Sequence, residues 1–136
     1  MVKSELTQAD YTALAEFRYL IRSFLEFSEN AARRAGLTPR QHQAILVIKG
    51  YRGGEPISVG DLADRLRIRH NTAVELAGRL VECGLVERMH DEADQRRVLL
   101  RPTGRAGRLL AQLSSAHRDE LLRIKPMLER VLERYA

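Results

Sequence analysis

Several side chains in this chain are of the types that contact double-stranded DNA, and they fall in two short groups. Arginine pairs with guanine, and asparagine with adenine, through two hydrogen bonds each. Both types occur between Arg67 and Arg79, and a second group surrounds the arginine pair at residues 96–97. The candidate DNA-contacting residues are Arg67, Arg69, His70, Asn71, Thr72, Glu75, Arg79, Asp94, Arg96 and Arg97.

The first group requires two helices and a turn to position it. Ser58, followed three residues later by Asp61, forms a capping-box pattern that predicts the start of a short helix. A turn is expected at residues 67–69, where Ile68 is the apolar plug. The second helix is predicted over about residues 70–83, since apolar residues recur there at helical spacing. Its buried stripe is expected to consist of Ala73, Leu76, Ala77 and Leu80.

The second group requires a hairpin. Branched residues favour strands at residues 85–90 and 97–101, and the segment between them is polar apart from one alanine. Gly84 separates the hairpin from the preceding helix, because glycine readily adopts the left-handed conformation that ends helices. Helix, turn, helix and hairpin in this order predict a winged helix-turn-helix, whose polar loop can reach a phosphate or a minor groove.

Alternative roles remain open for several of these residues. Glu75 can accept a hydrogen bond from a cytosine amino group, or it can pair with Arg79 one helical turn later. The intrahelical pair is favoured. Arg97 is expected to meet the DNA backbone. Ser58 and Thr38 can donate to phosphates, although helix capping is the favoured role for both.

The segment from Leu66 to Arg88 resembles the recognition helix and first wing strand of the MarR family of transcriptional regulators. It contains Asn71-Thr72-Ala73, Arg79-Leu80 and Gly84-Leu85-Val86-Glu87-Arg88. Residues 94–98, followed by Thr103-Gly104, resemble that family's wing signature, and residues 37–41 resemble the start of the helix before the reading head. The resemblance covers about residues 14–132. Three positions depart from the family pattern: Pro102 stands where leucine is usual, Arg69 where a small hydroxyl residue is common, and Glu75 puts an acid on the groove-facing side.

The resemblance implies a sequence-specific transcriptional regulator that binds double-stranded DNA. A ligand-responsive repressor, acting as a homodimer on a palindromic operator, is the expected form. By the same resemblance, Asp94 fixes the wing and Arg96 enters the minor groove, whose narrow form attracts arginine. The recognition helix would enter the major groove with its N-terminal end first. The alternative is a winged-helix module that binds a protein partner, since a fold does not by itself decide function.

Long helical patterns flank the predicted reading head. Residues 5–36 and 104–136 carry apolar residues at helical spacing, and Pro126 is expected to kink the second helix or to open a new one. A single small domain would leave much of this apolar surface exposed to solvent, and large exposed apolar surfaces usually mark interfaces. We therefore expect one mainly α domain over residues 1–136, with a small β-hairpin wing. Its winged region lies at about residues 37–104, and its flanking helices intertwine in a homodimer. A compact monomeric bundle is the alternative.

The composition narrows the function further. A net charge of +5 favours a polyanionic partner. The chain has no phosphate-binding glycine loop and no nucleophile with a base at a recognisable spacing, so no enzyme is predicted. The four histidines are scattered, so neither a metal site nor a cofactor is expected. No apolar run is long enough to span a membrane, and the polar N-terminal segment lacks a signal-peptide pattern, so we expect a cytoplasmic protein.

An effector site is implied only by the resemblance. In the MarR family, small aromatic or phenolic acids often bind where the dimer helices meet the reading head. Such a pocket here would draw on Tyr19, Phe24, Phe27, His42 and Ile45, for which core packing is the favoured alternative. The single cysteine, Cys83, is expected to be a buried and inert thiol rather than a redox sensor.

Overall fold

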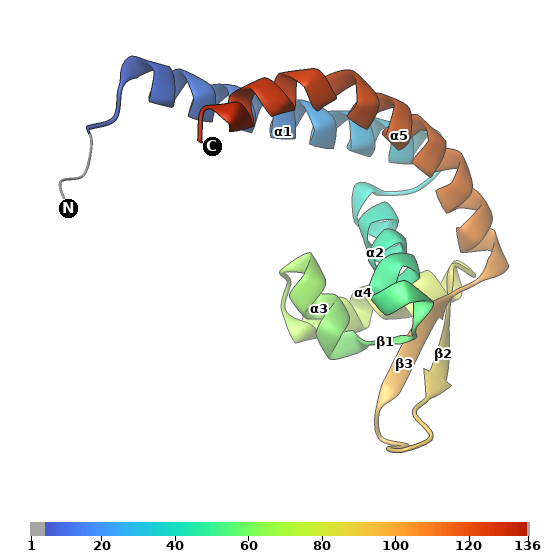
Figure 1. Cartoon of the computed structure of the whole chain (residues 1–136). Coiled ribbons are helices and arrows are strands. Elements are labelled where there is room, and N and C mark those ends of the chain that lie inside the picture. Colours follow the sequence, from blue (N-terminus) through green and yellow to red (C-terminus); the bar gives the residue numbers. More distant parts are fainter. Residues whose placement is uncertain (1–4, 136) are drawn as a thin grey trace.

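The computed structural model describes residues 5–135, which form a mainly helical chain with a small antiparallel sheet (Figure 1). In chain order the elements are α1 (Gln8–Arg34), α2 (Pro39–Gly50), the 3₁₀ helix η1 (Tyr51–Gly54), β1 (Ile57–Ser58), α3 (Val59–Leu66), α4 (His70–Glu82), β2 (Val86–His90), β3 (Val98–Pro102) and α5 (Gly104–Glu133). The predicted order of helix, turn, helix and hairpin is confirmed. None of these helices is both long and apolar enough to cross a membrane.

The first and last helices, α1 and α5, lie side by side and form a long arm (Figure 1). At the end of the arm, Arg134 Nε donates a hydrogen bond to Asp10 Oδ1 at 2.9 Å. Helix α5 runs through Pro126 as one element, so the new helix considered at that proline does not form. Ile124 and Val131 are buried on either side of Pro126, and their packing offsets the backbone hydrogen bond that proline cannot make.

The remaining elements form a head that spans residues 37–103. Its sheet has the strand order β1-β3-β2, with both pairs antiparallel. The hairpin was expected from the sequence, but β1 was not. That strand has only two residues, Ile57 and Ser58, which pair with Leu100 and Leu99. Two residues are too few to show the alternation that identifies a strand.

Side-chain caps begin the helices where the sequence places them. Thr38 forms a full capping box with Gln41, and Thr103 accepts a hydrogen bond from the amide of Ala106 at the start of α5. Ser58 caps α3 by accepting from the amide of Asp61 at 3.1 Å. The reciprocal half of the box predicted there does not form, because the Asp61 carboxylate accepts the Tyr51 hydroxyl instead.

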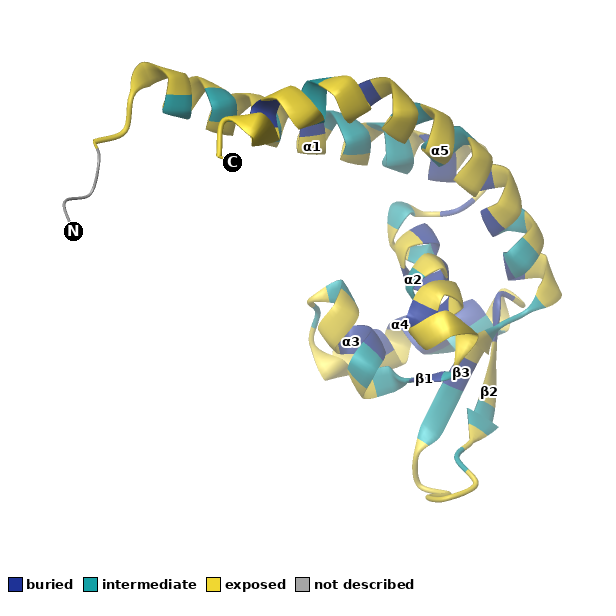
Figure 2. Ribbon diagram, viewed as in Figure 1, coloured by how far each residue is buried: buried dark blue, intermediate teal, exposed yellow. Residues whose placement is uncertain are grey.

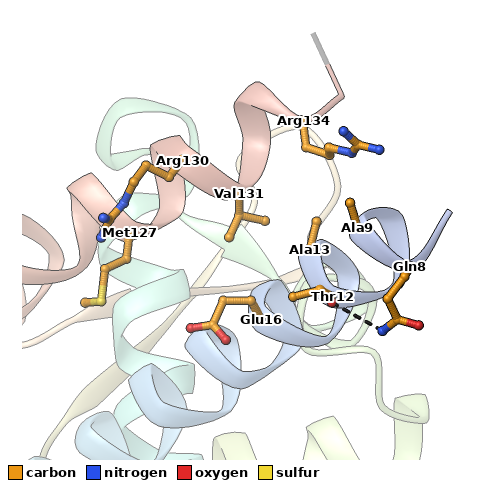
Figure 3. A pocket seen from close by; sticks show the side chains of 9 residues that line it. All are labelled: Gln8, Ala9, Thr12, Ala13, Glu16, Met127, Arg130, Val131 and Arg134. Carbon is orange, nitrogen blue, oxygen red and sulfur yellow. Dashed lines mark hydrogen bonds between the residues drawn. The ribbon is translucent and has the colours of Figure 1, made fainter.

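The core of the molecule lies in the head and continues into the lower part of the arm. Its largest fully buried side chains are Ile45, Ile48, Ile57, Leu62, Leu80, Leu85 and Leu100. Most of the arm is by contrast exposed (Figure 2). On α1 and α5 the exposed large apolar side chains are Tyr11, Leu14, Tyr19, Ile21, Leu25, Leu121, Leu122 and Leu132. One copy of the chain therefore leaves a long apolar surface uncovered.

Candidate nucleic-acid interface

The turn between α3 and α4 sets the direction of α4. Arg67 ends α3 in the left-handed conformation, with φ of 58°, and its Nη1 lies 3.5 Å from Asp64 Oδ1. The amide of Ile68 bonds back to the carbonyl of Ala63, and the Ile68 side chain packs against the core as predicted. Arg69 then precedes the first turn of α4 without making a side-chain cap. Its guanidinium is therefore not used in starting the helix.

Helix α4 has one buried and one exposed face. The four residues predicted for the buried stripe, Ala73, Leu76, Ala77 and Leu80, are all buried. Four of the predicted contact residues, His70, Asn71, Glu75 and Arg79, are exposed, while Thr72 is half-buried. No ion pair joins Glu75 to Arg79 among the described residues, so the favoured intrahelical pair is wrong. Both side chains point away from the core, and each is available to another partner.

The loop at the tip of the hairpin, residues 91–97, is closed by its own hydrogen bonds. Asp94 accepts the amide of Arg96 on its side chain at 3.0 Å and the amide of Arg97 on its carbonyl at 2.9 Å. The Asp91 carboxylate accepts the amide of Ala93 at 2.9 Å. The Arg96 side chain is 96% exposed and lies 3.8 Å from Asp94. Asp94 therefore shapes the loop, and the Arg96 guanidinium projects into solvent.

Arg97 occupies a different environment from Arg96. Its guanidinium lies 3.9 Å from Asp61 Oδ2 at the start of α3 and 3.8 Å from Asp91 Oδ2 in the loop. The Tyr51 hydroxyl donates to the same Asp61 oxygen at 2.8 Å. This hydrogen bond is the main reason that the pKa of Asp61 is lowered, and the Ser58 hydroxyl and the charge of Arg97 lower it further. Asp61 is therefore held as a carboxylate.

The start of α3, the start of α4 and the wing meet around one hollow of about 280 Å³. Three predicted contact residues, His70, Arg96 and Arg97, line it together with the N-terminal turn of α3. The first turn of a helix offers free amide hydrogens and a positive dipole end, both of which favour an anion. The structure thus brings the two groups of predicted residues together at one end of α4. Arg79 lies near the other end of that helix and does not line the hollow.

Comparison with known proteins identifies this arrangement. Residues 35–97 match the model of the MarR family. The head of this chain is therefore similar to the MarR family, and it has the winged helix-turn-helix fold. The residues matched run from the end of the arm through α2, α3 and α4 to the tip of the wing, so they include both groups of candidate contacts. The resemblance predicted from the sequence is confirmed over these residues.

Solved structures share the fold over almost the whole chain. AbsC, a MarR-family transcriptional regulator from Streptomyces coelicolor, is similar with a TM-score of 0.71 at 17% identity, covering 96% of this chain and 99% of AbsC. MepR of S. aureus, solved as a DNA complex, gives a TM-score of 0.68 at 18% identity and covers 91% of this chain and 86% of MepR. NadR in complex with 4-hydroxyphenylacetate gives 0.70 at 22% identity, covering 97% of this chain and 90% of NadR. No curated protein matches this chain in sequence.

The residues considered for an effector pocket are only partly gathered in this MarR-type fold. Phe24, Phe27 and His42 converge on His117, with ring centroids 5.8, 5.5 and 5.1 Å from the His117 ring. Ile45 is fully buried, whereas Tyr19 is 63% exposed. Of the cavities described, only one of about 360 Å³ between α1 and α5 is lined by any of the five, and that residue is Phe27. The alternative of core packing therefore describes Ile45 well.

Histidine 117 is the residue that sequence reasoning missed at this junction. Its ring bonds through Nδ1 to the carbonyl of Leu113 at 2.7 Å and through Nε2 to Ser28 Oγ at 2.8 Å. It stands on α5 between α1 and α2, where the arm meets the head. Burial lowers the pKa of His42, and the charge of His117 lowers it further. Ser28 and His117 lie far apart in the chain. Their contact across the arm can be predicted only when it is known which helix faces pack together.

Cys83 and the metal-ligating side chains were the remaining subjects of prediction. Cys83 is exposed, so the expectation of a buried thiol is wrong. It caps the end of α4; its carbonyl accepts a hydrogen bond from Arg105, and its sulfur accepts one from Gln41 Nε2 at 4.0 Å. Within residues 5–135 no group of three or more metal-ligating side chains is found.

Proposed function

We propose that this protein is a homodimeric transcriptional regulator that binds double-stranded DNA through α4 and the wing. The observation that carries the proposal is the hollow shared by His70, Arg96 and Arg97, because it places the exposed start of α4 beside the exposed arginine of the wing. A recognition helix inserted by its N-terminal end, with a cationic loop next to it, suits a major groove and the adjacent backbone or minor groove. The fold is shared with MepR, which was solved with DNA.

The roles of the α4 residues follow from their positions along the helix. Asn71 is exposed in the first turn, where it can pair with adenine, and Arg69 immediately before the helix can pair with guanine. His70 and Thr72 flank these two residues. Glu75, without an intrahelical partner, accepts a cytosine amino hydrogen in this proposal. Arg67, in the turn before α4, and Arg79, near the far end of α4, contact phosphates, which position a protein without reading the sequence.

The wing supplies the minor-groove contact. Arg96 is the inserted residue because its side chain is exposed, and Asp94 holds the loop that presents it. A narrow minor groove has enhanced negative potential, which attracts an arginine placed in it.

The exposed apolar surface of the arm supports the homodimer. Large apolar side chains exposed along both α1 and α5 form a surface that a second copy can cover with its own arm. A two-fold dimer would carry two recognition helices to successive major grooves, roughly 34–36 Å apart, and would favour a palindromic operator. In this proposal residues 5–36 and 104–136 are dimerisation helices, and residues 37–104 bind DNA.

We also propose that a small effector regulates DNA binding by this protein. NadR, which shares the fold, was solved with 4-hydroxyphenylacetate. In this chain the cluster of Phe24, Phe27, His42 and His117 lies where the arm meets the head, so an aromatic or phenolic acid bound there would change the angle between them. In this proposal the protein is a repressor, and binding of the acid at this position releases it from DNA.

A duplex titration at several salt concentrations tests the proposal. Affinity for a duplex selected from random sequence should fall as salt rises, with a log–log slope of about −0.9 for each phosphate neutralised. Arg69→Ala should weaken binding, whereas Arg33→Ala, an exposed arginine near the end of α1, should not. If no duplex binds with such a slope, the fold serves a protein partner instead.

A further inference from the structure

Arg97 is the wing residue whose surroundings the proposed DNA contacts do not explain. An arginine that contacts only phosphates needs no partner within the protein. The Arg97 guanidinium instead lies between two carboxylates, 3.9 Å from Asp61 and 3.8 Å from Asp91. These carboxylates belong to separate parts of the head, since Asp61 is in the first turn of α3 and Asp91 follows β2.

The loop at residues 91–97 has little else to hold it against the head. Strand β1 pairs with β3 only at Leu99 and Leu100, so at the tip of the hairpin β3 is paired with β2 alone and not with the rest of the head. The other hydrogen bonds and ion pairs that the described loop residues make stay within the hairpin. The pair between Arg97 and Asp61 is therefore the polar link between this loop and α3.

Asp61 is itself held in place by neighbours from two other elements. Its carboxylate accepts the Tyr51 hydroxyl at 2.8 Å, and the Tyr51 side chain is buried at the end of α2. The Tyr51 ring is flanked by the guanidinium carbons of Arg52 at 5.1 Å and Arg65 at 5.9 Å from its centroid. Tyr51, Asp91 and Arg97 also line one hollow of about 290 Å³, which Glu55 borders. The anchor for Arg97 is thus a fixed point of the head.

We propose that Arg97 is a positioning residue, which clamps the wing to α3 and so fixes the angle at which Arg96 meets DNA. Arg96 immediately precedes Arg97 in the chain, and its own side chain has only Asp94 as a partner in the described structure. Without the clamp the loop would sample many orientations, and binding DNA would have to order it. The effect of the clamp on DNA binding rests on the proposed function, but the clamp itself exists without DNA.

Loop order in the free protein is the first test, because it does not depend on DNA binding. Backbone ¹⁵N relaxation of the whole protein should give order parameters for residues 92–96 close to the rigid value of about 0.85, falling toward about 0.6 in Arg97→Gln. Asp61→Asn should lower them as well, and the double variant should add little to Arg97→Gln, since both remove one link. Arg101→Gln is the matched control: it removes an arginine from the same hairpin, but one that pairs with Glu87 inside the hairpin at 2.9 Å. Unchanged order in Arg97→Gln, or an equal loss in Arg101→Gln, would overturn the clamp.

DNA affinity is the second test, and it separates a clamp from a phosphate contact. An exposed ion pair contributes at most about 1 kcal/mol. Loss of the pair in both wings of a dimer should therefore lower its affinity for DNA by up to about 25-fold. Relative to Arg101→Gln, the slope of log affinity against log salt should stay the same. A slope reduced by about 0.9 for each Arg97 removed, with unchanged loop order, would make Arg97 a phosphate contact and end the clamp while the proposed function stands. If Arg97→Gln loses loop order but the wild-type protein binds no duplex, the clamp stands and the proposed function fails.

Discussion

Two alanine substitutions on α4 should have very different effects on stability, because they lie on opposite faces of that helix. Leu80 is fully buried, whereas Val74 is 46% exposed. Leu80→Ala removes three buried carbon groups at about 0.8 kcal/mol each, and the cavity left behind adds to this, so a loss of about 3–4 kcal/mol is expected. That is a large part of the roughly 5–15 kcal/mol that stabilises a typical domain.

Val74→Ala should leave the free energy of unfolding nearly unchanged. Two carbon groups, about half exposed, account for a loss of about 0.8 kcal/mol. Alanine is the better helix former by up to about 0.7 kcal/mol, which offsets most of that loss. The two effects almost cancel, so the helix should tolerate the change.

Urea unfolding followed by circular dichroism measures both variants. All samples must have the same protein concentration, because the stability of a dimer depends on it. The slope of the free energy against urea should not change, so a shift in midpoint reports stability alone. A Val74→Ala variant destabilised as much as Leu80→Ala would place the wrong face of α4 in the core and would remove the exposed polar face on which DNA reading rests.

Three further predictions concern the wing, the arm and its junction with the head. Arg96→Ala should bind DNA more weakly by about 1–3 kcal/mol per wing without a change in melting temperature, since its side chain is exposed; equal affinity in a duplex titration would remove the wing from the interface. Leu14→Glu should convert the dimer to a monomer in analytical ultracentrifugation, because Leu14 lies on the exposed apolar surface of α1; an unchanged mass would place the interface elsewhere. The lowered pKa of His42 means that the unfolded chain binds more protons as pH falls below about 6.5, so stability should decrease there, and His42→Phe should abolish that decrease in urea unfolding at several pH values. The same pH dependence in the variant would assign the effect to other groups.

The head was largely predictable because its signals are local. The Thr38 capping box, the left-handed Gly84 and the α4 stripe each depend on residues within a few positions of one another. Local hydrogen bonding and helical periodicity decide such features, and both can be found in a sequence.

The missed features depend on partners that are far apart in the chain. The Tyr51 hydroxyl competes for the Asp61 carboxylate and so breaks the predicted capping box. The pair between Arg97 and Asp61 joins two elements that are distant in the chain, so nothing in the sequence shows it. His42 and His117 looked scattered, yet the packing of the arm on the head brings their rings together. Cys83 is exposed because it follows the last turn of α4 rather than lying on the buried stripe.

Hydroxyl-radical footprinting on a selected duplex tests the central claim most directly. Two copies of α4 that each enter a major groove should give two protected stretches, centred about 10–10.5 base pairs apart, and Arg96→Ala should reduce the protection beside them. A single protected stretch, or a duplex cleaved evenly along its length at low salt, would contradict the account.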